Sequence, residues 1–217
     1  GPDGVVRGQI VHQVLEHLGE RELDRLLEDA IGRWDPDAPT PEHAEGLAYR
    51  EALRAEVERV ADHPEYRALA ERPGARRELE FVHLAGADGD GYLEGKIDLA
   101  SRSADGVMLL DVKTYQGTDP AQLAAVAARY RLQRDAYVAA VEAIAGEPVA
   151  RFAFHFSRAG RQVVSAITAG DRAAARERLA AMLREIGQGE PGLARDAGDC
   201  RWCGYRAVGW CEGAAGS

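Results

Sequence analysis

Two carboxylates and a lysine lie close together near the middle of the sequence, in two stretches with the pattern of neighbouring strands. Asp98 lies in the stretch 91–99, and Asp111 and Lys113 lie in the stretch 107–115. Side chains two positions apart share one face of a strand, so Asp111 and Lys113 should point the same way. Turn-forming residues separate the two stretches, which predicts a hairpin that brings Asp98 beside this pair.

Two carboxylates a few ångströms apart repel each other, and partial burial makes the repulsion more costly. A divalent cation would remove this cost, so Asp-x-Lys after an upstream Asp predicts a metal-dependent hydrolytic site. The same pattern is also typical of an ordinary ion pair on an exposed strand. Two observations favour the site: Asp111 follows the apolar run 107–110, and Lys96 and Lys113 are the only lysines in an arginine-rich sequence.

Composition indicates one globular domain. The sequence has 217 residues, of which 46% are hydrophobic and 29% are charged. The net charge of −9 argues against a broadly basic nucleic-acid-binding coat, but it leaves room for a local basic groove. No apolar run reaches membrane-spanning length, so we expect no membrane partner. Gly1-Pro2 is typical of the remnant of a cleaved tag, so we expect native sequence upstream to be missing.

The hydrophobic periodicity predicts an alternation of helices and strands. We expect helices at 5–19, 20–33, 41–61, 64–71, 121–145 and 171–187, and strands at 76–84, 91–99, 107–115, 149–157 and 162–167. Thr40-Pro41 has the pattern of an N-cap followed by a proline in the first turn. The segment 20–75 carries no evident chemistry, so we interpret it as a helical insert that shields one side of the domain or shapes a substrate entrance.

Several polar residues outside the hairpin are candidates for the same site. Gly8, His12 and Glu16 follow one another at four-residue intervals on the first helix. A single histidine on a helix is more often structural than a ligand, but the carboxylates elsewhere need a partner. Glu80, on the strand 76–84, could point at the metal site or could be an ordinary ion-paired glutamate.

Further along, Gln133 and Tyr137 are one turn apart on the helix 121–145, with Arg129 near them. A solvated helix face would look the same, so this basic patch is weak support on its own.

All three cysteines fall in the tail 196–217. Cys200 and Cys203 have the spacing that lets two thiolates hold one metal or cluster iron, and Cys211 follows eight positions later. Three thiolates are one short of a closed tetrahedral site, and free structural cysteines are the alternative. The odd number of cysteines argues against a disulfide framework, and we therefore expect a cytoplasmic protein.

The polar residues form an ordered set of motifs that covers nearly the whole chain. They are Arg7-Gly8-x-x-x-His12-x-x-Leu15-Glu16, Arg77-Glu78-x-x-Phe81, Gly95-x-x-Asp98, Asp111-x-Lys113-Thr114, Gln133-x-x-x-Tyr137 and Cys200-x-x-Cys203 with Cys211. This set resembles the RecB-type nuclease domain of the PD-(D/E)XK superfamily. That group includes the nuclease modules of bacterial helicase–nucleases (RecB, AddA, AddB and the mycobacterial Adn subunits) and the Cas4 nucleases. The insert is the least matched part.

The resemblance implies a restriction-endonuclease-like α/β fold: a mixed central sheet flanked by helices, with the active site at one sheet edge. Residues 1–217 would then be a single nuclease domain excised from a larger helicase or repair polypeptide. The implied metal ligands are His12, Asp98, Asp111 and the Val112 carbonyl. Lys113 is the implied catalytic lysine, acting with Asp98 and Asp111. The implied supporting or DNA-binding residues are Gln133, Tyr137, Glu16, Glu80 and Arg129.

The implied activity is hydrolysis of DNA, with exonuclease action expected, supported by Mg²⁺ or Mn²⁺. The implied partners are DNA, with the single-stranded form expected, and a helicase domain or subunit of a DNA repair and recombination complex. Iron–sulfur members of this group use a fourth cysteine upstream of the histidine helix, so a 4Fe–4S cluster on Cys200, Cys203 and Cys211 would require one in the full-length protein. Two alternatives stay open: a catalytically silent DNA-binding module, and a small zinc- or iron-binding interaction domain.

Overall fold

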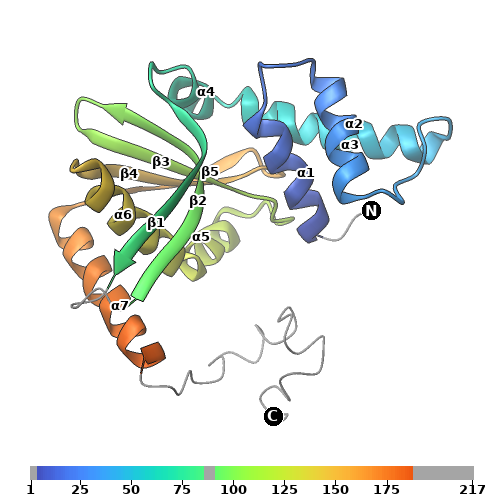
Figure 1. Ribbon diagram of the computed structural model, residues 1–217. Coiled ribbons are helices and arrows are strands. Elements are labelled where there is room, and N and C mark those ends of the chain that lie inside the picture. Colours follow the sequence, from blue (N-terminus) through green and yellow to red (C-terminus); the bar gives the residue numbers. More distant parts are fainter. Residues whose placement is uncertain (1–3, 86–90, 188–217) are drawn as a thin grey trace, which may run out of the picture.

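A five-stranded mixed sheet runs through the middle of the molecule, and helices cover both of its faces (Figure 1). The computed structural model describes residues 4–85 and 91–187. The strands lie side by side in chain order: β1 (Arg76–Ala85), β2 (Gly91–Ser103), β3 (Gly106–Lys113), β4 (Val149–Phe156) and β5 (Arg161–Ala166). All neighbouring pairs are antiparallel except β3 and β4, which are parallel. The predicted α/β fold with a mixed sheet between helices is confirmed.

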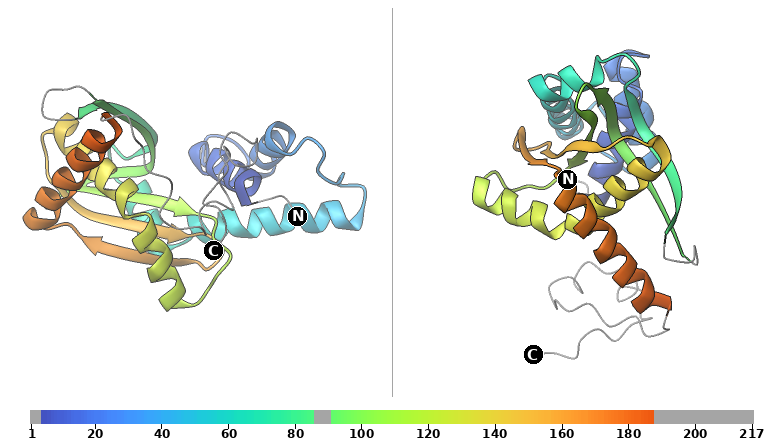
Figure 2. Two further views of the ribbon diagram at one scale, coloured as in Figure 1. Left: turned by 90° about the horizontal axis from the view of Figure 1, so that it is seen from below. Right: turned by 90° about the vertical axis from the view of Figure 1, so that its left-hand side faces the viewer.

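Among the described residues, four helices precede the sheet in the chain, two lie between β3 and β4, and one follows β5. They are α1 (Gly4–Glu16), α2 (Leu23–Trp34), α3 (Ala44–Ala61), α4 (Pro64–Ala70), α5 (Pro120–Arg129), α6 (Arg131–Ala145) and α7 (Ala169–Gly187). Figure 2 shows α1, α2 and α3 gathered on one side of the sheet and α5, α6 and α7 on the other. None of the helices that the structure describes is long and apolar enough to cross a membrane.

The sheet separates two hydrophobic cores. One core joins the first four helices to residues such as Leu99 and Leu110 on the near face of the sheet. The other joins the later helices to Leu109 and Phe152 on the far face. Adjacent residues Leu109 and Leu110 therefore enter opposite cores, as the two-residue period of a strand requires. Because both faces are buried, β3 is apolar along most of its length.

The helical insert is part of the first core rather than an appended unit. Leu53 and Val57 of α3 are fully buried in the same cluster as Ile10 of α1 and Leu99 of β2. A buried ion pair adds to this packing: Arg7 of α1 lies 2.5 Å from the carboxylate of Glu56 on α3. The insert therefore fixes the position of α1, the helix that carries His12.

Several expected helix boundaries differ from the structure, and two of them show why. The single helix predicted over 121–145 is two helices, α5 and α6, because the chain turns at Tyr130, whose backbone angles (φ −84°, ψ 10°) are not helical. The helix expected from Pro41 begins at Ala44 instead, after a turn closed by a hydrogen bond from the His43 N–H to the Thr40 carbonyl. In both places a local turn, rather than the apolar periodicity of the sequence, determines where the helix begins or ends.

Gly95 on β2 is a position where the packing admits no side chain. A Cβ atom at Gly95 would lie 2.7 Å from the ring of Phe81 and 3.2 Å from that of Tyr137. These two rings pack edge to face over the strand, with 5.6 Å between their centres. Gly95 thus allows Tyr137 of α6 to rest against the sheet beside the candidate site.

We predict that Gly95→Ala lowers the free energy of unfolding by about 1–3 kcal/mol, because the added methyl group must displace two packed rings. Gly32→Ala is the matched control: Gly32 lies in α2, and a Cβ there would have nothing within 4 Å. The control should raise stability by up to about 1 kcal/mol through helix propensity. Urea unfolding followed by circular dichroism measures both, and equal effects would contradict the packing argument.

Candidate active site

The register of the β2–β3 hairpin brings Asp98 level with Asp111. Leu99 pairs with Leu110 and Ala100 with Leu109, so the next facing positions are the two aspartates. Asp98 is then held in place by the backbone, because the Val112 N–H donates a hydrogen bond of 2.5 Å to its carboxylate. The hairpin predicted from the sequence is confirmed, and it places two acidic side chains at one point of the sheet.

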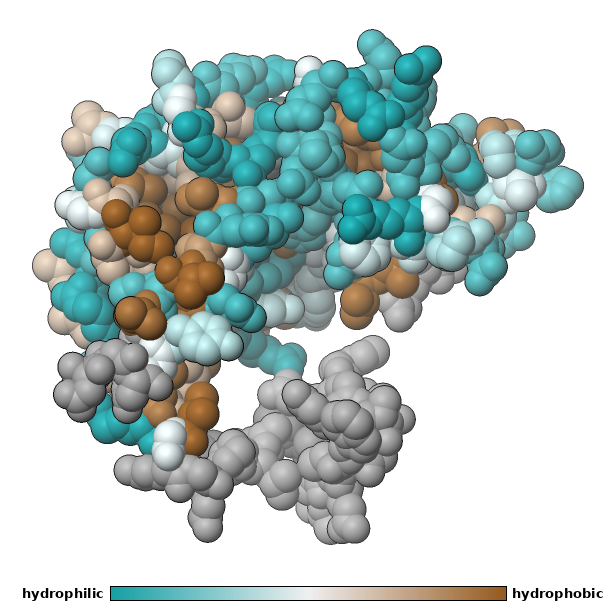
Figure 3. Space-filling view, viewed as in Figure 1, coloured by the Kyte–Doolittle hydropathy of each residue, from teal (hydrophilic) through white to brown (hydrophobic). Residues whose placement is uncertain are grey.

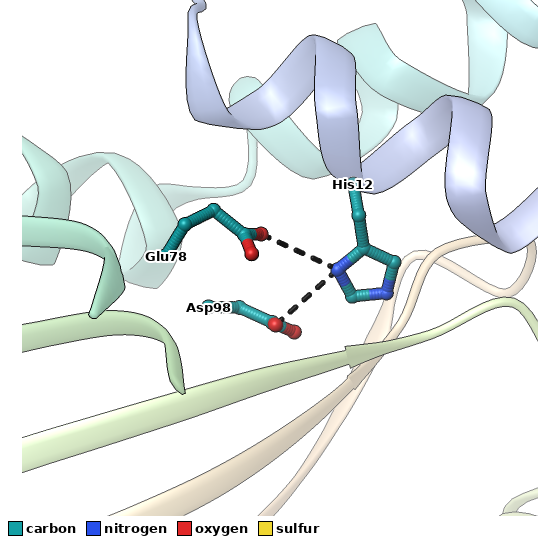
Figure 4. A group of neighbouring side chains, drawn as sticks. All are labelled: His12, Glu78 and Asp98. Atoms are coloured by element: carbon teal, nitrogen blue, oxygen red, sulfur yellow. Dashed lines mark ion pairs between the residues drawn. The ribbon is translucent and has the colours of Figure 1, made fainter. Parts of the chain in front are cut away.

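The second part of the site comes from α1, which passes over the sheet at this point. His12 Nδ1 lies 3.2 Å from Asp98 Oδ1 and 3.5 Å from Glu78 Oε1 (Figure 4). The imidazole points down from the helix between the two carboxylates, which come from β1 and β2. One ligand atom from each of these residues lies within 4.8 Å of the other two. Along 4–85 and 91–187, this is the one group of three such residues that could hold a metal ion.

Glu78 occupies the position that the sequence analysis considered for Glu80. Glu78 lies between Arg77 and Leu79, which pair with Leu99 and Ile97, so it faces Asp98 across the two strands. Its φ of 48° is the one positive value among the described residues other than glycine. Such a backbone interrupts the regular alternation of faces that the prediction assumed. Glu80 is exposed and supplies no ligand atom to the cluster, and its role as a supporting or DNA-binding residue stays a prediction.

The sequence analysis included Glu78 in a family motif but assigned it no role in the site. Arg77-Glu78 belongs to the motif on which the family resemblance rests, whereas strand alternation gave no reason to prefer it over Glu80. The backbone at Glu78 depends on tertiary contacts, so this choice could not be made from spacing alone.

Lys113 and Asp111 form the third part of the site, with α6 packed against them. Lys113 Nζ lies 2.8 Å from Asp111 Oδ2 and donates a hydrogen bond of 2.8 Å to Gln133 Oε1. The Gln133 amide donates to Asp111 Oδ1 at 3.2 Å and to the Tyr137 hydroxyl at 2.8 Å. Tyr137 in turn donates to the Lys96 carbonyl of β2 at 2.7 Å. These four side chains therefore form one network that crosses from β3 through α6 to β2.

An aromatic ring completes the surroundings of the lysine. Lys113 Nζ lies 4.2 Å from the centre of the Tyr130 ring, at the turn between α5 and α6. A cation over a ring face is stabilised by about 0.5–2 kcal/mol, depending on how far it is desolvated. Lys113 is thus surrounded by a carboxylate, an amide oxygen and a ring, and its ammonium group has a defined position.

Burial and charge shift the pKa values of the site in ways that match its geometry. Burial, followed by the charge of Asp98, raises the pKa of Asp111 to about 7 although Lys113 opposes the shift. Burial alone would lower the pKa of His12, but its contacts with Asp98 and Glu78 raise it to about 10. The protons on these groups neutralise a set of carboxylates that would otherwise need another cation.

Comparison with known protein families identifies the superfamily of the chain. The sequence model of the PD-(D/E)XK nuclease superfamily matches residues 2–211. The chain belongs to the PD-(D/E)XK nuclease superfamily. No curated protein was found to match the sequence.

One solved structure agrees with this assignment at the level of the fold. The crystal structure of a proposed exonuclease from Eubacterium rectale superposes with a TM-score of 0.58 at 12% sequence identity, over 100% of this chain and 78% of that one. The crystal structure of SSO0001 superposes with a TM-score of 0.49 at 10% identity, over 97% of this chain and 86% of that one. The mixed sheet with flanking helices is the PD-(D/E)XK fold.

PD-(D/E)XK nucleases use divalent metal ions, and the donor set at this site fits one. Ligands on opposite sides of Mg²⁺, each at about 2.1 Å, are about 4.2 Å apart. The atoms of His12, Glu78 and Asp98, within 4.8 Å of one another, need only small movements to reach that spacing. Asp111 is 2% exposed, and its buried Oδ2 lies 2.8 Å from the ammonium of Lys113. A buried carboxylate oxygen in this state is a further candidate ligand.

The remaining predicted residues lie at different distances from this centre. Glu16 lies 3.6 Å from the ammonium of Lys96, which is 3.0 Å from Glu78, so it touches the edge of the cluster. The Val112 carbonyl stays a predicted ligand. Arg129 is an exposed residue at the end of α5, and its proposed role in DNA binding also stays a prediction. The cysteines Cys200, Cys203 and Cys211 lie outside the described residues.

We predict that Glu78→Gln weakens the binding of Mn²⁺ by about tenfold or more, because it removes a charged ligand from the cluster. Glu80→Gln makes the same chemical change two residues along the same strand and should leave the affinity unaltered. Isothermal titration calorimetry of the two variants and the unsubstituted protein compares the dissociation constants directly. A larger loss for Glu80→Gln would overturn the placement of the metal.

Proposed function

We propose that this protein is a divalent-metal-dependent nuclease that hydrolyses DNA, as the nuclease module of a RecB-type helicase–nuclease. The observation that carries the proposal is the convergence of His12, Asp98, Asp111 and Lys113 from three separate elements on one point. Chance placement of acidic groups would not also supply a partly buried lysine whose ammonium is oriented by Gln133. The superfamily assignment makes a nuclease the expected use of such a site.

The reaction explains why these residue types are needed. A phosphodiester resists attack because its negative charge repels a nucleophile. A divalent ion held by His12, Glu78 and Asp98, with Asp111 beside it, would neutralise this charge and lower the pKa of a bound water. Asp98 is already oriented for ligation because the Val112 N–H fixes one of its oxygens and leaves the other facing His12.

Lys113 is the residue that would act on the reacting groups. Its ammonium can orient the attacking water and stabilise the charge that develops on the phosphate. Gln133 and Tyr130 hold the ammonium from two sides, so it needs no reorganisation during the reaction. An arginine cannot take this place, because its planar guanidinium is larger and directs its donors differently.

The finer parts of the proposal rest on the order of the motifs. RecB-type nucleases share the order of motifs from the histidine helix to Gln133 and Tyr137. Here the Gln133 amide donates hydrogen bonds to both Asp111 and Tyr137. Exonuclease action on DNA, and attachment to a helicase within a longer polypeptide, are proposed from that resemblance. The similarity to a proposed exonuclease supports the nuclease fold on which this part of the proposal rests.

We predict that Lys113→Ala, Asp111→Ala and Lys113→Arg each lower the rate of DNA cleavage by at least about a hundredfold. The assay uses end-labelled single- and double-stranded DNA with Mg²⁺ or Mn²⁺, and EDTA as the metal-free control. Circular single-stranded DNA separates the two modes of action, because only an endonuclease can cut it.

A melting curve for each variant confirms that the loss does not reflect unfolding. Arg25→Ala, on the exposed side of α2, serves as the control for removal of a positive charge away from the site. Cleavage by the Lys113→Ala protein at the unsubstituted rate would contradict the assigned role. Binding of DNA with no metal-dependent cleavage by the unsubstituted protein would favour the silent DNA-binding module instead.

A further inference from the structure

An open groove of about 570 Å³ continues from the candidate metal cluster along α1. His12 and Glu78 belong both to the cluster and to the wall of the groove. The far wall is formed by Arg33 and Trp34, the last two residues of α2 in the helical insert. The groove therefore joins the reacting centre to a part of the chain for which the sequence analysis found no chemistry.

Trp34 is held at this groove by contacts on two sides. Its indole N–H donates a hydrogen bond of 2.6 Å to the side chain of Gln13, the residue after His12. Its ring also packs against the first hydrophobic core, and it is only partly buried. Most of the residues that line the groove are polar, so the large apolar ring of Trp34 stands apart from them.

Arg33 places a positive charge over this ring. Its guanidinium carbon lies 5.0 Å from the centre of the Trp34 ring. Because Arg33 is exposed, it can leave the ring at small cost and turn to an anion in the groove. The two acidic residues of the groove, Glu16 and Glu78, both lie close to the ammonium of Lys96, which offsets their repulsion of an anion.

The surface elsewhere shows how distinct this groove is. In Figure 3, hydrophobic residues gather at the left of the molecule, whereas the surface toward α1 is mostly hydrophilic. A second hollow, of about 730 Å³, lies in that apolar region and includes Leu84, Leu93 and Leu179. An unstacked aromatic base attached to a phosphate suits the polar groove with its indole ring, and it suits the apolar hollow poorly.

We propose that the groove is a nucleotide-binding subsite for single-stranded nucleic acid, in which a base stacks on Trp34 and Arg33 pairs with a phosphate next to the scissile one. This proposal rests on the proposed nuclease function, because only a nuclease has a scissile phosphate. The binding itself can be measured without cleavage. A base can stack on an indole only when it is not stacked in a duplex, so the subsite selects unpaired strands. It also gives the helical insert a role in substrate positioning.

The test measures the affinity for fluorescein-labelled oligodeoxythymidine by anisotropy, with Lys113→Ala present in every protein so that no strand is cut. Trp34→Ala should weaken binding about fivefold to about a hundredfold, the range expected for the loss of one stacked base. An abasic strand of the same length has the phosphates without the bases, and its affinity should change little. Trp34→Phe should retain most of the affinity, because it keeps an aromatic ring but loses the bond to Gln13.

Arg33→Ala should weaken the binding of both strands and lower the slope of log affinity against log salt by about one unit. Arg25→Ala is the matched control on the same helix, and it should leave that slope closer to the unsubstituted value. A protein with Trp202→Phe and Trp210→Phe keeps Trp34 as its only tryptophan. Its fluorescence should be quenched by oligodeoxythymidine, which checks the stacking without altering the subsite.

The outcomes separate this proposal from the proposed function. Equal affinities for oligodeoxythymidine with and without Trp34→Ala, or equal losses for the normal and abasic strands, would overturn the subsite. Preference for duplex DNA over the single strand would overturn it as well. Absence of cleavage by the protein with Lys113 intact, together with the expected effects of Trp34, would instead overturn the nuclease and leave the subsite standing.

Discussion

The repulsion among three carboxylates is the constraint around which the structure is arranged. Glu78, Asp98 and Asp111 come from adjacent strands and meet where α1 crosses the sheet. His12 compensates two of them, Glu78 and Asp98. Further groups are Lys96 for Glu78, the Val112 N–H for Asp98, and Lys113 with Gln133 for Asp111. Without these partners, the burial of the acids would oppose folding by several kcal/mol per charge.

The partners come from elements that are far apart in sequence, so the insert and the sheet must be fixed relative to each other. Glu56 of α3 is 1% exposed and accepts hydrogen bonds of 2.5 Å from Arg7 of α1 and from Ser157 at the end of β4. Ser157 also donates from its backbone N–H to the Lys113 carbonyl at 3.0 Å. A single buried carboxylate thus connects α1, which carries His12, to the strand end that carries Lys113.

The sequence predicted the parts of the site that follow from local regularity. Strand alternation and a turn were enough to place Asp98 beside Asp111 and Lys113, because a hairpin leaves few choices of register. Alternation failed at Glu78, where a positive φ breaks the regular strand geometry. The single histidine of α1 could not be assigned from periodicity, since an exposed or buried role depends on what packs against the helix. The resemblance to a family supplied that choice.

The contribution of the insert was beyond the reach of the sequence for a different reason. Glu56, Arg33 and Trp34 lie in ordinary amphipathic helices, and nothing in their spacing distinguishes them from solvated or core positions. Their roles arise from contacts with residues that are far away in the chain, such as the bond from Trp34 to Gln13. Only the packing of α2 and α3 against α1 brings them to the site.

The break between α5 and α6 shows how a local departure from regular structure serves the site. In a continuous helix over 121–145, the direction of the Tyr130 side chain would be set by the helix alone, and nothing would direct its ring toward the sheet. The turn at Tyr130 places that ring 4.2 Å from the Lys113 ammonium, and α6 then starts in a direction that brings Gln133 to the same group. One turn therefore supplies two of the groups that hold the ammonium. The third is Asp111, on the same face of β3, so the lysine is oriented from the sheet and from the helix layer together.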